Sequence, residues 1–190
     1  MKLGVALPIV DIGGEPATLK EFAQLAEEIG YHGIAAPDHV LGVNVASRPD
    51  WTQGRARSTD FYHDPFVLFG FLAGCTKIAD FSTQVLILAQ RQTVLVAKQA
   101  ACLDVLSGGR FRLGIGVGWN EVEFVGLNEN FRNRGRRSEE QVEVMRALWA
   151  EPHVSFKGRW HRPDKTAPAG PPLPLTCARS ARRPPCAFSG

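Results

Sequence analysis

The most constraining feature of this sequence is a repeat of short β-branched apolar runs, each followed by a helical pattern. The runs begin near residues 2, 33, 81 and 111, so one strand–helix unit takes about 30 residues apart from one long insertion. Repeated βα units predict an α/β fold whose parallel sheet has right-handed crossovers. Two architectures fit, an open doubly wound sheet and part of a (β/α)8 barrel. A whole barrel needs eight units and typically ~250 residues, and only four units are evident here.

Local signals predict where the strands and helices begin and end. The expected strands are Lys2–Pro8, Gly33–Ala36, Phe81–Leu88 and Phe111–Ile115. Two capping boxes, Thr18 with Glu21 and Ser138 with Gln141, predict helix starts. Asp64-Pro65 predicts the start of an apolar, heavily buried helix ending near Cys75, and a further helix is expected over Thr93–Leu106. Gly30 is expected to end the first helix.

Two stretches lack this periodicity. Residues 40–63 are too long for an ordinary connection, and such loops are usually functional or disordered. Near the C-terminus, Val154–Trp160 predicts a hairpin turning at Lys157-Gly158. Residues 163–190 then hold seven of the 13 prolines and no period, so we expect a folded region over 1–162 and a disordered tail over 163–190. The mixture of proline, arginine and alanine in this tail is typical of GC-rich DNA translated in a wrong frame.

Charge and cysteine usage exclude several classes of partner. The tail has one acidic and four basic residues, which accounts for the net charge of +3 and leaves residues 1–162 neutral. A nucleic-acid interface needs a clustered basic face on folded structure, so none is expected. The four cysteines have no metal-type or disulfide-framework spacing, and no apolar run approaches the ~20 residues of a membrane helix. We therefore expect a cytoplasmic protein with no metal site and no membrane partner.

Candidate functional residues follow from the rule that ligands gather at the C-terminal ends of parallel strands. Asp38 and His39 are the most informative, because a histidine exchanges protons near neutral pH and an adjacent carboxylate adds a second titratable group. The alternative is that Asp38 caps backbone amides of the loop while His39 is a partly buried polar residue. The other strand ends are Leu7-Pro8, Leu88 to Arg91 and Gly116 to Glu121.

The glycine run Gly114-Ile-Gly-Val-Gly118 follows a strand and must be compared with the dinucleotide fingerprint G-x-G-x-x-G. The sixth position is Trp119 when counted from Gly114 and Glu121 when counted from Gly116, so the match fails in both frames. These glycines instead allow close backbone approach to a planar ligand, or simply a bend where the strand ends. Neither a nucleophile elbow nor a Walker-type lysine loop is present, which leaves hydrolase and phosphoryl-transfer functions without support.

Several stretches together resemble one family. They are Ala36-Pro-Asp-His-Val40, the strand end Thr83–Arg91, the helix Val96–Asp104, the block Leu106-Ser-Gly-Gly-Arg-Phe-Arg-Leu-Gly-Ile-Gly-Val-Gly-Trp119 with its continuation to Phe124, and Phe156–His161. In order and spacing, over residues 1–162, the chain resembles the luciferase-like monooxygenases, most closely the branch that uses the deazaflavin coenzyme F420.

This resemblance implies a TIM (β/α)8 barrel of the luciferase-like type, of which about the first four βα units are present. It implies that Asp38 and His39 form a catalytic or cofactor-orienting pair, with His39 exchanging the proton that accompanies hydride transfer. It also implies a non-prolyl cis peptide near Gln84–Val85 and a substrate lid formed by 40–63 with Trp51. The residues it places at the cofactor are Pro8, Gln84, Val85, Leu86, Gly116, Gly118 and Trp119.

Three functional hypotheses remain open at this point. The first is an oxidoreductase that uses coenzyme F420 on a small organic substrate, and the second is an FMN-dependent monooxygenase of the same fold. The third is a non-catalytic truncated fragment, because the family's phosphate-binding residues come largely from strands beyond these four units. A half barrel has two unpaired sheet edges, which invite pairing with another chain, so a homodimer is one expected assembly.

Overall fold

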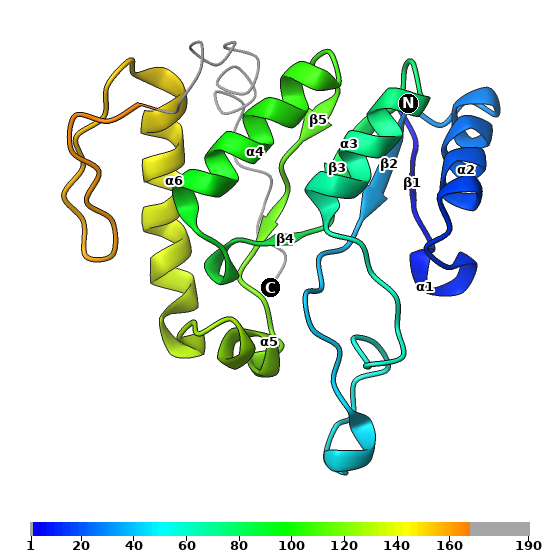
Figure 1. Ribbon diagram of the computed structural model, residues 1–190, viewed down its shortest axis with the longest axis horizontal. Coiled ribbons are helices and arrows are strands. Elements are labelled where there is room, and N and C mark those ends of the chain that lie inside the picture. The colour runs from blue at the N-terminus through cyan, green and yellow to red at the C-terminus, as the bar shows by residue number, and fades with distance from the viewer. Residues whose placement is uncertain (1, 168–190) are drawn as a thin grey trace.

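The computed structural model describes residues 2–167 of the chain as a parallel sheet whose strands alternate with helices (Figure 1). The strands are β1 (Gly4–Ala6), β2 (Gly33–Ala36), β3 (Asp80–Thr83), β4 (Leu86–Ile87), β5 (Phe111–Arg112) and β6 (Ile115–Gly116). The α-helices are α1 (Ile9–Ile12), α2 (Pro16–Glu28), α3 (Pro65–Cys75), α4 (Thr93–Leu106), α5 (Glu121–Gly126) and α6 (Arg134–Ala150). Three 3-10 turns are η1 (Val45–Ser47), η2 (Leu88–Gln90) and η3 (Phe131–Asn133).

The main sheet has the strand order β1-β2-β3-β5, with every pair parallel. The large helices α2, α3, α4 and α6 follow the strands in the same order along the sheet (Figure 1). The α/β class and the parallel sheet predicted from the βα repeat are therefore confirmed. Loop 40–63 has no regular structure beyond η1 and one bridge between Val43 and Arg57, also as predicted.

Two of the predicted strands are each broken in the middle. The expected strand Phe81–Leu88 is divided into β3 and β4, and the expected strand Phe111–Ile115 is divided into β5 and β6. The second halves, β4 and β6, form a separate parallel pair. At the break the Thr83 hydroxyl donates to the carbonyl of Gly114 (2.7 Å) and accepts from its N–H (2.9 Å). A side chain thus replaces the backbone ladder locally, which a pattern of apolar residues does not reveal.

The core lies between the sheet and its helices. Its fully buried side chains include Leu19, Ile34, Phe69, Leu72, Phe81, Val96 and Val144. Helix α3 contributes Phe69 and Leu72 to this core, yet Val67 is 70% exposed and Phe71 is 41% exposed. The expectation that α3 is heavily buried is therefore wrong for its outer face. Among the described residues, no helix is long and apolar enough to cross a membrane.

Helix ends were predicted with mixed success. Asp64 caps α3 as expected, accepting from the N–H groups of Phe66 and Val67. Both capping boxes are wrong, since α2 begins at Pro16 and α6 begins at Arg134, so Thr18 and Ser138 lie inside their helices. Pro at the first helical position sets the earlier start of α2. At the other end of α2, Gly30 has φ +94° and ends the helix as predicted.

The end of the sheet where the strands begin is held by two charged side chains. Arg110 donates to the carbonyls of Ser107, Ala79 and Ala73, and the Glu27 carboxylate accepts from three consecutive backbone N–H groups, residues 77–79. Burial raises the pKa of Glu27, but these N–H groups and the charge of Arg110 outweigh it, so the pKa lies below its ordinary value. The backbone groups at this end of the sheet therefore have hydrogen-bond partners within the protein, and these bonds hold the strands and helices together.

The predicted hairpin over 154–160 is longer than expected. Val154 forms an antiparallel bridge with Thr166, and the N–H of Phe156 donates to the carbonyl of Pro163 (2.9 Å). The chain reverses between Gly158 and His161 rather than at Lys157-Gly158. The start of the expected tail therefore pairs with the folded region, while the rest of the predicted disordered tail lies outside the described residues.

Candidate active site

The C-terminal ends of the strands meet at one end of the sheet, where α1, α5 and loop 40–63 also lie (Figure 1). This is the end at which the sequence placed its candidate residues. Asp38 and His39 follow β2, the segment from Leu88 to Arg91 follows β4, and Gly118 and Trp119 follow β6. Pro8 precedes α1 and its carbonyl accepts from the N–H groups of Asp11 and Ile12.

Asp38 is a buried anchor between strand ends. Its carboxylate accepts the backbone N–H of Ile87 (2.9 Å) and two N–H groups of Arg91 (2.7 and 3.2 Å). Arg91 also pairs with Asp64, the cap of α3, at 2.9 Å. Burial lowers the pKa of Arg91, but the two carboxylates outweigh it and raise the pKa above its ordinary value. Asp38 therefore ties β2 to β4 and, through Arg91, to the far end of loop 40–63.

The carboxylate that pairs with His39 belongs to Glu123, which lies 84 residues further along the chain on α5. His39 Nδ1 lies 3.1 Å from Glu123 Oε1, and the Glu123 side chain is only 1% exposed. The same carboxylate accepts from the backbone N–H of Val40 (3.0 Å) and from Gln90 Nε2 (3.2 Å). Burial raises the pKa of Glu123, but hydrogen bonds from His39, Gln90 and the backbone outweigh it, so the pKa lies below its ordinary value.

A deprotonated Glu123 accepts only, so it selects the tautomer of His39 with its proton on Nδ1. Nε2 is then left as an acceptor, and within the described part of the chain the ring's recorded hydrogen bond is the one at Nδ1. The ring keeps 14% of its side-chain surface exposed. The arrangement orients His39 Nε2 at the C-terminal end of the sheet, where this nitrogen can take up or release a proton.

Aromatic rings surround this histidine. The ring centroids of His39 and Tyr62 are 4.8 Å apart, and those of His39 and Trp119 are 6.0 Å apart. Trp51, from the far part of loop 40–63, contacts Trp119 with a centroid distance of 5.6 Å. Loop 40–63 thus places Tyr62 against His39, and its Trp51 reaches Trp119, which follows β6.

The other cofactor candidates have defined places. The peptide bond between Gln84 and Val85 is cis, at the position that the family resemblance implied. Val85 is 40% exposed while Leu86 is fully buried. A Cβ at Gly116 would lie 2.4 Å from Val85 Cγ2, and one at Gly118 would lie 2.6 Å from Ile87 Cγ2. These two glycines therefore allow β6 to pack against β4, and their contact with a cofactor stays a prediction.

Four residues of this site were missed or left without a role by sequence reasoning. Arg91 and Gln90 fell within a candidate strand end, but nothing local indicated their partners. Glu123 and Tyr62 received no role. Asn120, whose side chain caps α5 by accepting from the N–H of Val122, was an available sign that a helix begins there and carries Glu123.

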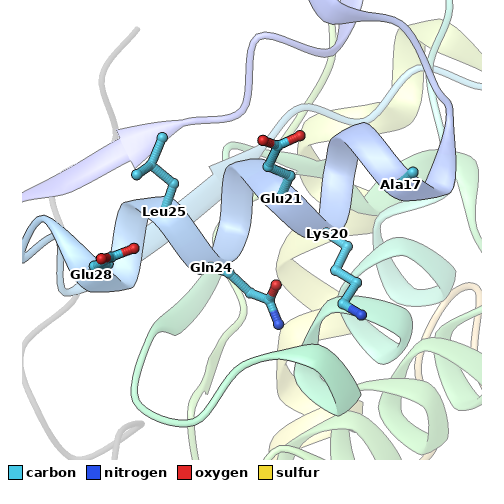
Figure 2. Close-up of a pocket in the computed structure, with 6 residues that line it drawn as sticks. All are labelled: Ala17, Lys20, Glu21, Gln24, Leu25 and Glu28. Carbon is cyan, nitrogen blue, oxygen red and sulfur yellow. The ribbon is translucent and has the colours of Figure 1, made fainter.

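Two surface hollows lie away from this site. One, of about 430 Å³, runs along α2 and is lined by side chains of that helix alone (Figure 2). The other, of about 420 Å³, lies between α4, α6 and the hairpin and includes Leu148, Trp160 and His161 in its lining. Neither is lined by a residue that contacts His39.

Among residues 2–167, no group of three His, Cys, Asp or Glu side chains could hold a metal ion.

Comparison with known proteins gives one family match. The family described as luciferase-like monooxygenase matches residues 1–184. An F420-dependent glucose-6-phosphate dehydrogenase of Amycolatopsis mediterranei is 32% identical over 152 residues, which cover 77% of this chain and 41% of that protein. The chain spans about half the length of the curated relatives it matches, for example 57% and 51% of two mycobacterial proteins.

Solved structures show the same fold. The monooxygenase RslO1 of Streptomyces bottropensis matches with a TM-score of 0.76 and 22% identity, over 93% of this chain and 51% of that one. The oxygenating constituent of 3,6-diketocamphane monooxygenase of Pseudomonas putida, solved with FMN, matches with a TM-score of 0.65 and 18% identity, over 85% of this chain and 43% of that one.

Proposed function

Because this chain belongs to the luciferase-like monooxygenase family, we propose that it carries the proton-transfer side of an oxidoreductase that moves hydride between coenzyme F420 and a small organic substrate. The observation that carries this proposal is His39, with Nδ1 held by Glu123 and Nε2 without a partner among the described residues. A proton carrier held in one tautomer at a ligand-binding end suits general acid–base catalysis.

The residues at this end of the sheet fit a flat ring cofactor. Val85, Val117 and Trp119 keep 38–45% of their surface exposed at this end of the sheet, and such side chains can contact an apolar ring. Gln90 Oε1 and Asn120 Nδ2 are buried and have no partner within residues 2–167. Gln90 belongs to this site because its Nε2 donates to Glu123, and Asn120 directly follows Trp119.

When bound, F420 supplies the hydride donor or acceptor. His39 Nε2 exchanges the accompanying proton with the substrate, Glu123 keeps the ring in the required tautomer, and Asp38 with Arg91 fixes the strand ends that carry them. The four βα units described here correspond in this proposal to the first half of a (β/α)8 barrel, so groups that hold the phosphate part of a cofactor lie largely outside them. The FMN-dependent monooxygenase remains the alternative, because a solved structure of similar fold was determined with FMN.

Titration of the purified chain with F420 and with FMN, followed by absorbance and equilibrium dialysis, tests the proposal. Saturable binding of F420 in preference to FMN supports it, and preference for FMN replaces it with the alternative. Binding of neither cofactor assigns the chain to the non-catalytic class, in which two copies associate through their sheet edges. Sedimentation equilibrium on the same sample then distinguishes such a homodimer from a monomer.

A further inference from the structure

The outer faces of helices α3 and α4 carry large apolar side chains. On α3, Val67 and Phe71 lie one turn apart and are 70% and 41% exposed. On α4, Leu95, Val105 and Leu106 are 51–76% exposed, and Leu95 and Leu106 lie three turns apart on one side of the helix. The two helices pack against each other (Figure 1). These five side chains therefore form one apolar surface, the α3–α4 face.

Charged residues distinguish the other two large helices from this face. Helix α2 has four charged residues and α6 has seven. Helix α3 has none, and the two in α4 are Lys98 and Asp104, of which Asp104 is buried. A helix on the surface of a monomer normally turns a charged or polar side toward water. Neighbouring helices that both turn an apolar side outward indicate a surface that another protein covers.

Further βα units of a barrel would not cover the α3–α4 face. Helices α3 and α4 are the middle two of the row of large helices, between α2 and α6 (Figure 1). Additional strands can pair only at the edge strands β1 and β5, and their helices would join the row beyond α2 and α6. The cofactor proposed above lies at the C-terminal ends of the strands and not on the outer side of the helices. The cover therefore comes from a separate molecule.

We propose that this molecule is a second copy of the chain, and that the two copies pair through their α3–α4 faces. In a two-fold dimer the same patch lies on both sides of the interface. A patch with charges of one sign would oppose itself, whereas an uncharged apolar patch is complementary to itself. On the same side of α3 as Val67, Gly70 and Gly74 have open space where a Cβ would be, which lets the two copies of α3 cross closely.

The size of the α3–α4 face suits such a dimer. A large apolar side chain has roughly 150–200 Å² of surface, so the exposed parts of these five amount to roughly 450–600 Å² per copy. A standard interface takes about 800 Å² from each partner and has an apolar centre with a polar rim. The five side chains are thus enough for the apolar centre of an interface of that size.

Sedimentation equilibrium of the full chain over a range of concentrations tests the proposal. We expect a reversible dimer, and Val67→Glu should weaken it by about 100-fold or more because it places two like charges in one apolar interface. Val125→Glu is the matched control, since Val125 is 73% exposed but lies on α5, away from the α3–α4 face, and this variant should dimerise as the wild type does. A wild-type chain that stays monomeric overturns the proposal. So does a dimer that Val67→Glu leaves intact, which is the result expected if the copies pair through β1 and β5.

A second variant separates loss of the dimer from loss of the fold. Gly70→Gln adds a side chain into open space on an exposed helical position, where glutamine is a better helix former than glycine. The monomer should therefore stay folded by circular dichroism and by urea denaturation, while the dimer weakens. If Gly70→Gln dimerises as tightly as the wild type, the two helices do not cross there and the proposed contact is overturned. Since no cofactor is present, these results are independent of the F420 and FMN titrations.

Discussion

The described chain contains two carboxylate–histidine pairs, and they differ in what surrounds the histidine. Glu123 holds His39 at the C-terminal end of the sheet, with Oε1 to Nδ1 at 3.1 Å, and Glu140 holds His161 beside α6, at 2.8 Å. Each carboxylate also accepts backbone N–H groups of the segment that carries its histidine, residues 40–41 for Glu123 and residues 159–161 for Glu140.

The second ring nitrogen separates the two pairs. His161 Nε2 lies 2.5 Å from the Thr93 hydroxyl, which also accepts from Gln141. His39 Nε2 has no such partner among residues 2–167 and is surrounded by Tyr62 and Trp119. A pair with both nitrogens engaged fastens the hairpin to the helices, whereas a pair with one nitrogen free can exchange a proton. The same local motif therefore has both ring nitrogens engaged in one place and leaves one available, as the proposed function requires, in the other.

The largest expected difference is in turnover. His39→Gln keeps an amide that hydrogen-bonds Glu123 but cannot carry a proton, so turnover with the cofactor selected by titration should fall about 10²–10⁴-fold. His161→Gln should leave turnover per folded molecule unchanged. Steady-state absorbance of the cofactor measures both. Unchanged turnover in His39→Gln would exclude the proton-transfer role.

Removal of the buried carboxylate should have the next largest effect. Glu123→Ala leaves His39, Gln90 and two backbone N–H groups without their acceptor, at a cost of about 3 kcal/mol in the free energy of unfolding. Urea denaturation measures this loss. Glu121→Ala is the control, because Glu121 is exposed on the same helix and should change stability by less than about 0.5 kcal/mol. Equal losses in both variants would contradict a positioning role for Glu123.

The outer pair should cost less to break. The Glu140 side chain is 12% exposed, so water can replace part of its hydrogen bonding, and Glu140→Ala should lose about 1–2 kcal/mol. Glu139→Ala, an exposed neighbour on α6, serves as the control. The loss should appear together with faster proteolysis of the hairpin 154–166. A hairpin that resists cleavage as well as in the wild type would show that Glu140 does not fasten it.

The smallest expected effect is in the pH dependence of stability. Burial raises the pKa of Glu140, but hydrogen bonds from the N–H groups of residues 159–161 and from the His161 ring outweigh it. The pKa of Glu140 therefore lies below the ordinary value of 4.5, as does the pKa of Glu123. The unfolded chain binds protons before the folded one as pH falls, so this stability is present above about pH 4.5 and is lost as pH falls through the lowered pKa values. Glu123→Gln and Glu140→Gln should each flatten the urea-derived stability curve below pH 5. A curve that stays as steep as the wild type would refute this linkage.

Local sequence patterns predicted the parts of the fold that neighbouring residues control. Helix α4 and strand β2 have the bounds expected from the sequence, and Asp64 caps α3. The capping boxes failed because α2 begins earlier, at Pro16, and α6 at Arg134, and Ser138 lies buried inside α6. A four-residue motif reports a local preference, and helix length is decided by packing along the whole face.

The sequence by itself determined the βα order, and it named the strand ends, with His39 as the candidate proton carrier, as the place to expect chemistry. Only the tertiary structure decided which carboxylate serves it. Asp38 is adjacent in sequence, but its side chain is bound to Arg91 and the backbone of Ile87, while Glu123 reaches His39 across 84 residues. Adjacent residues on a chain leaving a strand need not point to the same place, and strand order and register bring distant side chains together.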